Sequence, residues 1–426
     1  MQKYRILILG SGGREHALGW KTSQSPLLEK LYFAPGNGGT RLIGENVVLN
    51  PLDFDAVADF VTTHHIDILV IGPEEPLVKG IVDYFKALPK FKDLILVGPD
   101  SQGAMLEGSK SWSKSFMQKY HIPTAAYRSF NEKNAHEAPE FLSSLRPPYV
   151  IKASGLAAGK GVIITSDLGE AEKTVTGMLS GDFGDAGKEV VIEEFLDGIE
   201  VSVFVLTDGK NFALLPEAKD YKRIGDGNTG PNTGGMGAVS PVPFAHGSFM
   251  DKVKDRIILP TLAGLLTEGI DYKGFIFFGL IKVNNEPFVI EYNARMGDPE
   301  TEAVMPRLKN DLIELFVSLQ NGTLGKTIIE HDDRTSLTVV MTSGGYPGHY
   351  EKGFEIIGSE KQEKSLIFHA GTSFKEEKLC TNGGRVIAIT SLEDTLAQAI
   401  ATTYKTVSEI HFKDKNYRND IGKDLQ

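Results

Sequence analysis

The fold is decided by residues 6–17, which read ILILGSGGREHA. The first four are continuously apolar, which is the pattern of a strand buried on both faces of a parallel sheet. A glycine-rich turn follows them, and then a helix-forming run that starts at Ala17. The order strand, glycine turn, helix predicts an α/β unit in which free amides at the helix start, with Arg14 beside them, can bind an anion.

The same turn is close to the dinucleotide-binding fingerprint Gly-x-Gly-x-x-Gly. Gly10 and Gly12 match its first two glycines, but Glu15 stands where the third belongs. That glycine lets the helix pack closely on the strand, so the bulky Glu15 counts against a bound dinucleotide. An NAD-dependent oxidoreductase, a nucleotide-binding module without catalysis and a glycine turn with no ligand all stay open at this point.

Two further apolar runs, residues 66–71 and 94–97, are each followed by a Gly-Pro pair. Strands that alternate with helical segments indicate an open parallel sheet, and the ligands of such sheets lie beyond the carboxyl ends of the strands. We therefore expect the loops at residues 35–39 and 72–75 to rim one crevice.

Length and composition bound the class of protein. The chain has 426 residues, of which 41% are hydrophobic and 24% charged, and this suggests about three globular domains. The net charge of −11 argues against a nucleic-acid or membrane-surface protein, because anionic partners need a basic face. Cys380 is the only cysteine, which excludes an internal disulfide and fits a reducing compartment. Since no signal-peptide core or apolar run of ~20 residues is present, we expect a cytoplasmic protein.

A glycine-rich loop lies between two apolar strand signals in residues 149–164. It contains three glycines, with Lys152 before it and Lys160 near its end. Such a loop can lay its backbone amides on a polyphosphate while the lysines supply positive charge. It lacks the Gly-Lys-Ser/Thr ending of a P-loop, and as an isolated motif it is equally compatible with a flexible hairpin.

A polar cluster follows the apolar strand signal at residues 288–290. Side chains alternate faces along a strand, so Glu291 and Asn293 point to one side while Tyr292 points to the other. A carboxylate beside an amide carbonyl suits a hard cation such as Mg²⁺, which shares its oxygen ligands with phosphates. The alternative is a polar strand end that runs into a turn, but the phosphate loop upstream favours a metal site.

Together, these features suit the transfer of a nucleotide phosphoryl group. The strand signal at residues 190–198 could offer backbone groups to an adenine, and Glu200 could bond a ribose, although a plain β-hairpin also explains both. Residues 200–205 alternate in the manner of a sheet strand. Residues 220–237 are charged and glycine-rich, and we expect a long loop here of the kind that is usually functional or disordered. We expect only a structural role for the turns at residues 344–348 and 382–385.

Several short motifs recur in a specific order along essentially the whole chain. They are GGREHA at residues 12–17, APGN at 34–37, GPE at 72–74, LEGSK at 106–110, GLAAGKGV at 155–162, GPNTGGMG at 230–237, GDPET at 297–301 and NGGR at 382–385. Each motif is modest alone. In this joint order, the chain closely resembles the phosphoribosylamine-glycine ligases, also called glycinamide ribonucleotide synthetases, a family of the ATP-grasp superfamily.

The resemblance implies a multidomain fold of the α/β and α+β classes. It implies a Rossmann-like N domain over residues 1–104, an ATP-grasp domain over 105–326 with a mobile lid over about 123–188, and a small α+β C-terminal domain over 327–426. It also implies the reaction: ATP, glycine and 5-phosphoribosylamine give ADP, phosphate and glycinamide ribonucleotide through a glycyl phosphate in de novo purine biosynthesis. The implied cofactors are ATP and Mg²⁺ or Mn²⁺, and the implied assembly is a monomer or a weak homo-oligomer.

By the same resemblance, each site residue receives a role. The catalytic residues would be Lys152, Arg295, Asp298 and Asp220. The ATP-binding residues would be Lys110, Lys152, Gly155, Gly159, Lys160, Gly161, Glu193, Phe195, Leu196 and Glu200. The substrate-binding residues would be Gly12, Gly13, Arg14, Asn37, Glu74 and Lys222, and the metal ligands would be Glu291 and Asn293.

Three residues depart from the family's common pattern. Ser11 replaces a frequent Asn, Lys219 replaces a common Gln, and Glu302 replaces a frequent Gln. The last two change the charge near the proposed acyl centre and leave the ATP site intact. Another ATP-grasp enzyme, such as a carboxylase of the biotin carboxylase type, is the related alternative.

Overall fold

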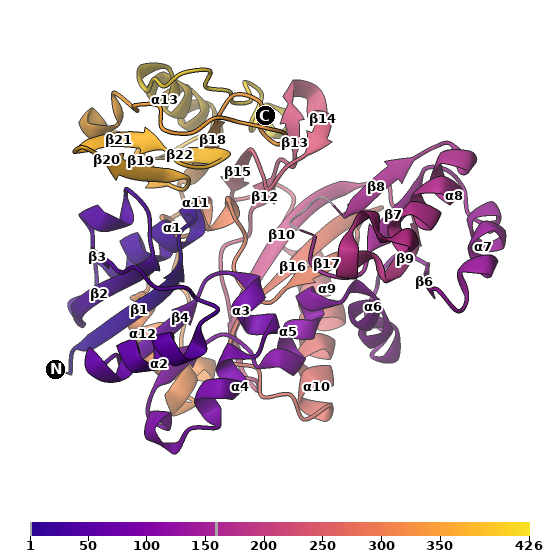
Figure 1. The fold of residues 1–426 in the computed structure, drawn as a ribbon, viewed down its shortest axis with the longest axis horizontal. Helices are drawn as coiled ribbons and strands as arrows, with labels where there is room; N and C mark the ends of the chain where they lie inside the picture. The colour runs from indigo at the N-terminus through magenta and orange to yellow at the C-terminus, as the bar shows by residue number, and fades with distance from the viewer. Residues whose placement is uncertain (1, 158–160) are drawn as a thin grey trace.

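The computed structural model describes residues 2–157 and 161–426, which form lobes around a cavity (Figure 1). The N-terminal lobe is drawn in indigo, and a magenta lobe that carries β6 to β9 projects from the opposite end of the molecule. The C-terminal lobe, in yellow, lies above the N-terminal lobe in this view. None of the helices in the described stretches is both long enough and apolar enough to cross a membrane.

The N-terminal lobe is built on a parallel sheet in the order β3-β2-β1-β4-β5. The central strand β1 pairs with β2 and β4, which places Ile8 between Phe33 and Val70. Residues 6–9 of β1 are fully buried, and this confirms the predicted strand of a parallel sheet. The strands are β1 Tyr4–Gly10, β2 Leu28–Pro35, β3 Glu45–Asn46, β4 Ile68–Ile71 and β5 Ile95–Val97.

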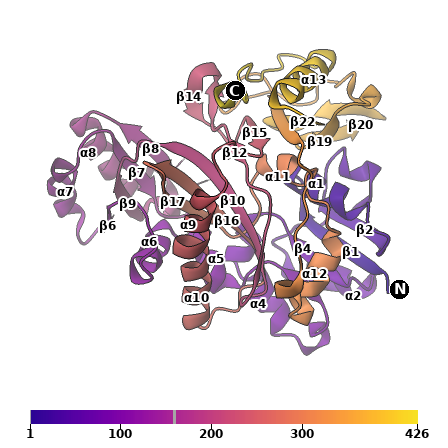
Figure 2. The ribbon, with the colours of Figure 1, turned by 180° about the vertical axis from the view of Figure 1, so that it is seen from behind.

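Helices cover both faces of this sheet. One face packs against α2 Phe54–Thr63 and α4 Ile81–Lys86, and the other packs against α12 Leu312–Asn321 from much later in the chain. Figure 2, which shows the molecule from behind, places α12 on the near side of β1 and β4. The Asp311 carboxylate caps the start of α12 by accepting from the amide of Ile313 at 2.8 Å. The remaining helices of the lobe are α1 Gly13–Thr22, α3 Glu74–Val78 and α5 Ser101–Gly108.

The central sheet is antiparallel, in the order β11-β10-β16-β17. Its two faces bury alternate residues: Phe204 joins the core shared with the N-terminal lobe, whereas Val203 joins the core under the helices on the other side. This confirms the alternation predicted for residues 200–205. The strands are β10 Ile199–Thr207, β11 Phe212–Leu214, β16 Gly274–Val283 and β17 Glu286–Asn293, and the covering helices are α6 Lys110–Lys119, α9 Ser248–Val253 and α10 Leu259–Thr267.

The magenta lobe has its own four-stranded sheet, β6-β9-β7-β8, and its own apolar core. The predicted hairpin of residues 149–164 is present as the antiparallel pair β7 and β8. Gly159 and Lys160, which we expected to bind phosphate, lie outside the described residues. The mobility of this lobe stays a prediction. Its elements are β6 Tyr127–Asn131, α7 Ala138–Ser144, β7 Tyr149–Ala153, β8 Val162–Thr165, α8 Leu168–Gly177 and β9 Glu189–Glu194.

The C-terminal lobe contains a five-stranded sheet in the order β12-β15-β18-β22-β19. Its first two strands lie at the two ends of residues 220–237, where we expected a long loop. That expectation was wrong in part, because the stretch is divided by two further short strands and residue 237 begins a strand that pairs with β18, about 100 positions later in the chain. The elements are β12 Lys219–Asp220, β15 Gly237–Ser240, β18 Thr335–Thr342, β19 Leu366–His369, β22 Arg385–Glu393 and α13 Leu396–Glu409.

Two antiparallel hairpins and one short helix complete the described fold. The hairpin between β12 and β15 consists of β13 Arg223–Gly225 and β14 Thr229–Asn232. A second hairpin, β20 Thr372–Lys375 and β21 Lys378–Thr381, belongs to the C-terminal lobe. The helix α11 Glu300–Val304 packs against α1 of the N-terminal lobe and β15 of the C-terminal sheet. The predicted multidomain α/β and α+β architecture is confirmed.

A glycine lets the turn before β15 approach the Asp298-Pro299 turn that precedes α11, and replacing it should destabilise the protein. Gly235 has φ +116°, and a Cβ there would lie 2.3 Å from Cδ of Pro299. Gly269 also has a positive φ, +74°, but a Cβ there would meet open space. We expect Gly269→Ala to cost about 1–2 kcal/mol of backbone strain and Gly235→Ala to lower the melting temperature clearly further. Equal decreases in melting temperature in the two variants would contradict the close approach of Gly235 to Pro299.

Candidate active site

A cavity of about 1360 Å³ opens between the lobes. Residues of the N-terminal sheet loops, the magenta lobe, the central sheet and the C-terminal lobe all line it. Most of the predicted site residues converge there. Those that line the cavity are Gly12, Arg14, Glu74, Lys110, Lys152, Gly161, Glu193, Phe195, Leu196, Glu200, Asp220, Lys222, Glu291, Asn293, Arg295 and Asp298.

Three predicted residues lie beside the cavity and do not line it: Gly13, Asn37 and Gly155. The Asn37 amide donates to the carbonyl oxygens of Ser11 at 2.9 Å and His369 at 2.7 Å. Its side-chain oxygen accepts from the backbone amides of two following residues. The Asn37 side chain is therefore fully used in joining loops of the N- and C-terminal lobes, and a direct contact with substrate stays a prediction.

One end of the cavity is positively charged. Glu193 on β9 is buried between Lys152, at 2.9 Å, and Lys114, at 3.1 Å. Burial opposes ionisation of Glu193, but the two lysines lower the pKa of its carboxyl. Burial also lowers the pKa of Lys114 to about 8. Two cations share one anion here, so the cluster has positive charge left for an anionic ligand.

Lys110 adds to this positive end from the start of α6. Its ammonium lies 3.3 Å from the carbonyl oxygen of Gly155, at the start of the glycine-rich loop. Burial lowers the pKa of Lys110, while the carboxylate of Glu291 opposes that shift. Lys110, Lys152 and the loop residues Leu156, Ala157 and Gly161 therefore face one space, where the sequence predicts a phosphate site.

The carboxylate and amide pair at the end of β17 faces the cavity as predicted. Glu291 and Asn293 both line it, whereas the hydroxyl of Tyr292 lies in the core, 2.8 Å from the hydroxyl of Thr261. Burial opposes ionisation of Glu291, but nearby lysines, above all Lys222, lower its pKa. Glu291 therefore presents an ionised carboxylate beside an amide oxygen, a donor set that suits a hard cation.

The other end of the cavity holds more acidic groups than basic ones. Lys222 lies 3.0 Å from Glu200 and 3.6 Å from Glu291. Burial raises the pKa of Asp220 to about 8, and repulsion from Glu300 adds to the shift. Burial raises the pKa of Glu300 as well. A divalent cation bound here would relieve this repulsion.

Metal ligation at this end would need oxygens that the protein does not supply. Among residues 2–157 and 161–426, no three His, Cys, Asp or Glu side chains are already gathered at metal-binding distance. Glu291 and Asn293 would supply two oxygens, and a cation that bridges protein and nucleotide completes its shell with phosphate and water. The donor set therefore fits a nucleotide-bound cation better than a structural metal.

Glu15 explains why the glycine turn differs from the dinucleotide fingerprint. Its carboxylate accepts from the backbone amide of Gly12 at 2.6 Å and pairs with Arg14 at 2.6 Å. A Cβ at Gly10 or Gly72 would lie within 2.5 Å of this side chain, so Glu15 fills the space between β1 and β4. The anion at the start of α1 is thus the protein's own carboxylate, which disfavours a dinucleotide pyrophosphate in that place.

A charge network joins the N-terminal lobe to the end of β17. Arg295 lies 2.6 Å from Glu107 and 3.4 Å from Glu74. Glu107 also accepts from the backbone amide of Ala294 at 2.8 Å. Burial opposes ionisation of Glu74, but Arg295 and Arg14 lower its pKa. Arg295 is therefore held on the cavity wall by carboxylates from two other elements.

Sequence reasoning missed two residues that hold the site. Arg385 lines the cavity, and its guanidinium lies 2.9 Å from a carboxylate oxygen of Asp298 and 2.7 Å from the carbonyl oxygen of Gly234. The turn at residues 382–385, for which we expected only a structural role, therefore contributes a side chain to the cavity wall. The signal was the arginine that ends the NGGR motif. Lys114 was also missed, since nothing in the local sequence shows that it meets Glu193.

Glu302 departs from the family pattern without adding negative charge. It is fully buried in α11, and neither carboxylate oxygen has a hydrogen-bond partner among the described residues. Burial, with repulsion from Asp298, raises the pKa of Glu302 well above its usual range. The raised pKa favours the neutral form of Glu302, which has nearly the shape of Gln.

Comparison with known proteins gives one consistent family. The chain matches the N domain, the ATP-grasp (A) domain and the C domain of phosphoribosylglycinamide synthetase over residues 4–107, 108–301 and 336–424. Phosphoribosylamine–glycine ligase of Escherichia coli (strain K12) is 46% identical over 425 residues, which are 98% of this chain and 98% of that protein. The protein of the same name from Pasteurella multocida is also 46% identical, over 98% of this chain and 97% of its own.

Solved structures extend the comparison. The crystal structure of phosphoribosylamine–glycine ligase from Thermotoga maritima is 36% identical, with a TM-score of 0.83 over 98% of this chain and 100% of that chain. The biotin carboxylase of Campylobacter jejuni is 15% identical, with a TM-score of 0.72 over 99% of this chain and 94% of that chain. At that identity the second similarity shows a shared fold alone.

Replacing Asp220 by Asn should change how stability depends on pH. In the folded protein the pKa of Asp220 is raised from 3.8 to about 8, so the folded state keeps a proton that the unfolded chain releases. The retained proton therefore contributes to the free energy of unfolding. This contribution is fully present below about pH 4 and is lost as the pH rises through 8. We therefore expect the melting temperature of Asp220→Asn, relative to wild type, to be higher at about pH 9 than at about pH 5. A difference that does not vary with pH would contradict the raised pKa.

Proposed function

This chain belongs to the phosphoribosylglycinamide synthetase family, and we propose that it joins glycine to 5-phosphoribosylamine in an ATP-dependent reaction. The products would be glycinamide ribonucleotide, ADP and phosphate, in purine biosynthesis. Matches to all three domains of the family and a 46% identical relative that covers nearly the whole chain support this assignment.

One observation in the cavity carries the proposal. The lysine cluster around Glu193 and the oxygen pair on β17 face the same space. Lys152 joins them, because its ammonium lies 2.9 Å from Glu193 and 3.3 Å from the carbonyl oxygen of Ile290, next to Glu291. A phosphate chain held by the lysines would therefore reach a cation held by Glu291 and Asn293.

We assign the binding roles along the cavity as follows. ATP phosphates are assigned to Lys110, Lys152 and the glycine loop with Gly155 and Gly161, adenine to Glu193, Phe195 and Leu196, and ribose to Glu200. Phosphoribosylamine is assigned to Gly12, Arg14 and Glu74, with Gly13 and Asn37 directly behind them. Activation of the glycine carboxylate is assigned to Asp220, Lys222, Arg295 and Asp298.

The chemistry explains why the site needs these groups. A carboxylate is a poor electrophile, so a glycine carboxylate oxygen first attacks the γ-phosphorus of ATP and the bond to ADP breaks. The amine nitrogen of phosphoribosylamine then attacks the carbonyl carbon, phosphate leaves, and the nitrogen loses a proton. The lysines and Arg295 would neutralise the charge on the transferring phosphoryl group and hold the reactants in line. Exclusion of water protects the glycyl phosphate, which supports a closing role for the magenta lobe.

The fold uses ATP with a divalent cation, and we propose Mg²⁺ or Mn²⁺ held by Glu291 and Asn293. The crowded carboxylates around Lys222 support this choice, because a cation there lowers their repulsion. When bound, such a cation screens charge on the β- and γ-phosphates. A cytoplasmic location and a monomeric or weakly associated state stay predictions from the sequence.

An omission assay with product identification tests the proposal. With ATP, glycine, phosphoribosylamine and Mg²⁺ present, we expect ADP and phosphate in equal amounts with glycinamide ribonucleotide, and loss of that product when either substrate is left out. AMP and pyrophosphate as products would exclude the acyl-phosphate route. Turnover that requires bicarbonate and not glycine would instead favour a carboxylase.

A further inference from the structure

The hairpin of β13 and β14 projects over the cavity but has little to hold it in place. Residues 226–231 are exposed, and no residue of the hairpin belongs to any of the hydrophobic clusters of the described chain. Yet Arg223, Asn228 and Asn232 line the cavity. Hairpins of two strands without an apolar face are marginal in water, so other contacts must fix this one.

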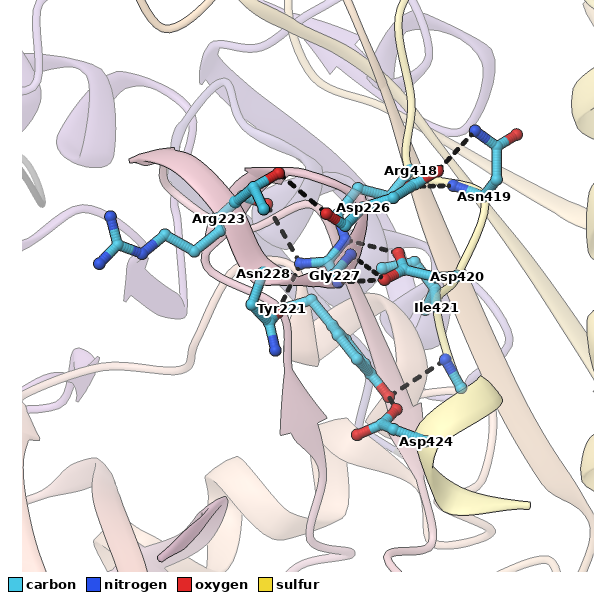
Figure 3. Close-up of polar contacts among 12 residues, drawn as sticks. Tyr221, Arg223, Asp226, Gly227, Asn228, Arg418, Asn419, Asp420, Ile421 and Asp424 are labelled. Atoms are coloured by element: carbon cyan, nitrogen blue, oxygen red, sulfur yellow. Dashed lines mark hydrogen bonds and ion pairs between the residues drawn. The ribbon is translucent and has the colours of Figure 1, made fainter. Parts of the chain in front are cut away.

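A segment almost 200 positions later supplies those contacts (Figure 3). Arg418 donates to the carbonyl oxygen of Arg223 at 3.2 Å and to the side-chain oxygen of Asn228 at 2.9 Å. The backbone amide of Asn419 donates to the Asp226 carboxylate at 2.7 Å, and its side-chain amide donates to the other oxygen at 3.1 Å. The Asp420 carboxylate accepts from the backbone amide of Gly227 at 2.8 Å. Three consecutive residues therefore hold the first strand and the turn of the hairpin.

Arg418 is itself rigidly placed. Its side chain is 1% exposed and forms a two-pronged pair with Asp420, with distances of 2.8 and 2.7 Å. Its carbonyl oxygen accepts from the hydroxyl of Tyr404 on α13 at 2.7 Å. The guanidinium lowers the pKa of Asp420 to about 2, so the ion pair persists at ordinary pH. A planar donor group with several N–H bonds is needed here, and Lys cannot replace it.

The same segment also holds residues 219 and 221, which directly precede the hairpin. The hydroxyl of Tyr221 accepts from the backbone amide of Gly422 at 3.1 Å and donates to the Asp424 carboxylate. Lys219 also pairs with Asp424. Figure 3 shows the Tyr221 ring below the Arg418 guanidinium, and the guanidinium carbon lies 5.2 Å from the ring centre. Residues 418–424 thus hold the chain at 219, at 221, at 223 and in the turn at 226–228.

Asp220 and Lys222 lie between these fixed points. Their neighbours on both sides are bonded to residues 418–424, whereas their own side chains face the cavity and its carboxylates. We propose that residues 418–424 are a latch that sets the position of Asp220 and Lys222, and that Arg418 is its positioning residue. Arg418 does not line the cavity, so it acts only through the chain that it holds.

Three variants test the latch. Arg418→Met keeps an unbranched chain in place of the apolar stem of arginine and removes every donor. Asn419→Ala is the milder second variant, because Asn419 is exposed and its loss removes the side-chain bond to Asp226 without opening a buried space. Arg307→Met is the matched control: Arg307 is 3% exposed and bonds the Asp332 carbonyl and the Ser240 hydroxyl, but it does not line the cavity or touch the hairpin.

The first readout is amide hydrogen exchange of the peptide that covers residues 223–232, in the full chain without ligands. We expect exchange to be about tenfold faster in Arg418→Met, and faster to a smaller degree in Asn419→Ala, than in wild type or Arg307→Met. This readout does not depend on the proposed reaction. Unchanged exchange in both latch variants would overturn the latch.

The second readout is kinetic and rests on the proposed function. In Arg418→Met we expect KM for glycine to rise about tenfold while KM for ATP stays within about twofold, because Asp220 and Lys222 shift and the lysine cluster does not. Arg307→Met, even if its melting temperature falls equally, should leave both values unchanged. Faster exchange together with an unchanged KM for glycine would overturn the positioning role. A wild type without ligase activity would refute the proposed function and leave the exchange result to decide on the latch.

Discussion

The buried contact of Lys152 with Glu193 is the interaction on which the arrangement of the site depends. Lys152 belongs to β7 and Glu193 to β9, Lys114 approaches from α6, and the Lys152 ammonium reaches the backbone of β17. One ion cluster therefore connects the magenta lobe to β17 of the central sheet. The contact lies beside Glu291, the first of the two oxygen donors that face the cavity. A buried charge is tolerated only when it is paired, so this cluster marks where the magenta lobe meets the central sheet.

Electrostatics divides the cavity into two functional ends. Lysines exceed carboxylates around Glu193, and carboxylates exceed lysines around Lys222. Phosphates would bind at the first end, and a cation and the carboxylate to be activated would lie toward the second. Glu302 fits the same pattern, because burial and repulsion from Asp298 raise the pKa of its carboxyl.

Local sequence patterns predicted the parts of the fold that depend on local chemistry. The apolar run at residues 6–9, the alternation along β10 and the faces of Glu291 and Tyr292 were all evident from periodicity. The pairing of β15 with β18 was not, because it joins residues about 100 positions apart and leaves no local signal. The same reason hides the partners of Lys114, Arg385 and Arg418. The resemblance to a known family filled part of this gap, because most of the site residues that it implied line one cavity.

Transfer of oxygen from glycine to phosphate reports directly on a glycyl phosphate. If a carboxylate oxygen attacks the γ-phosphorus, that oxygen stays with phosphorus when the amine displaces it. Turnover of glycine labelled with ¹⁸O in its carboxylate should therefore release phosphate that carries one ¹⁸O atom for each glycinamide ribonucleotide formed, measurable by mass spectrometry. Phosphate free of label from glycine would contradict activation of the carboxylate by phosphoryl transfer in this cavity.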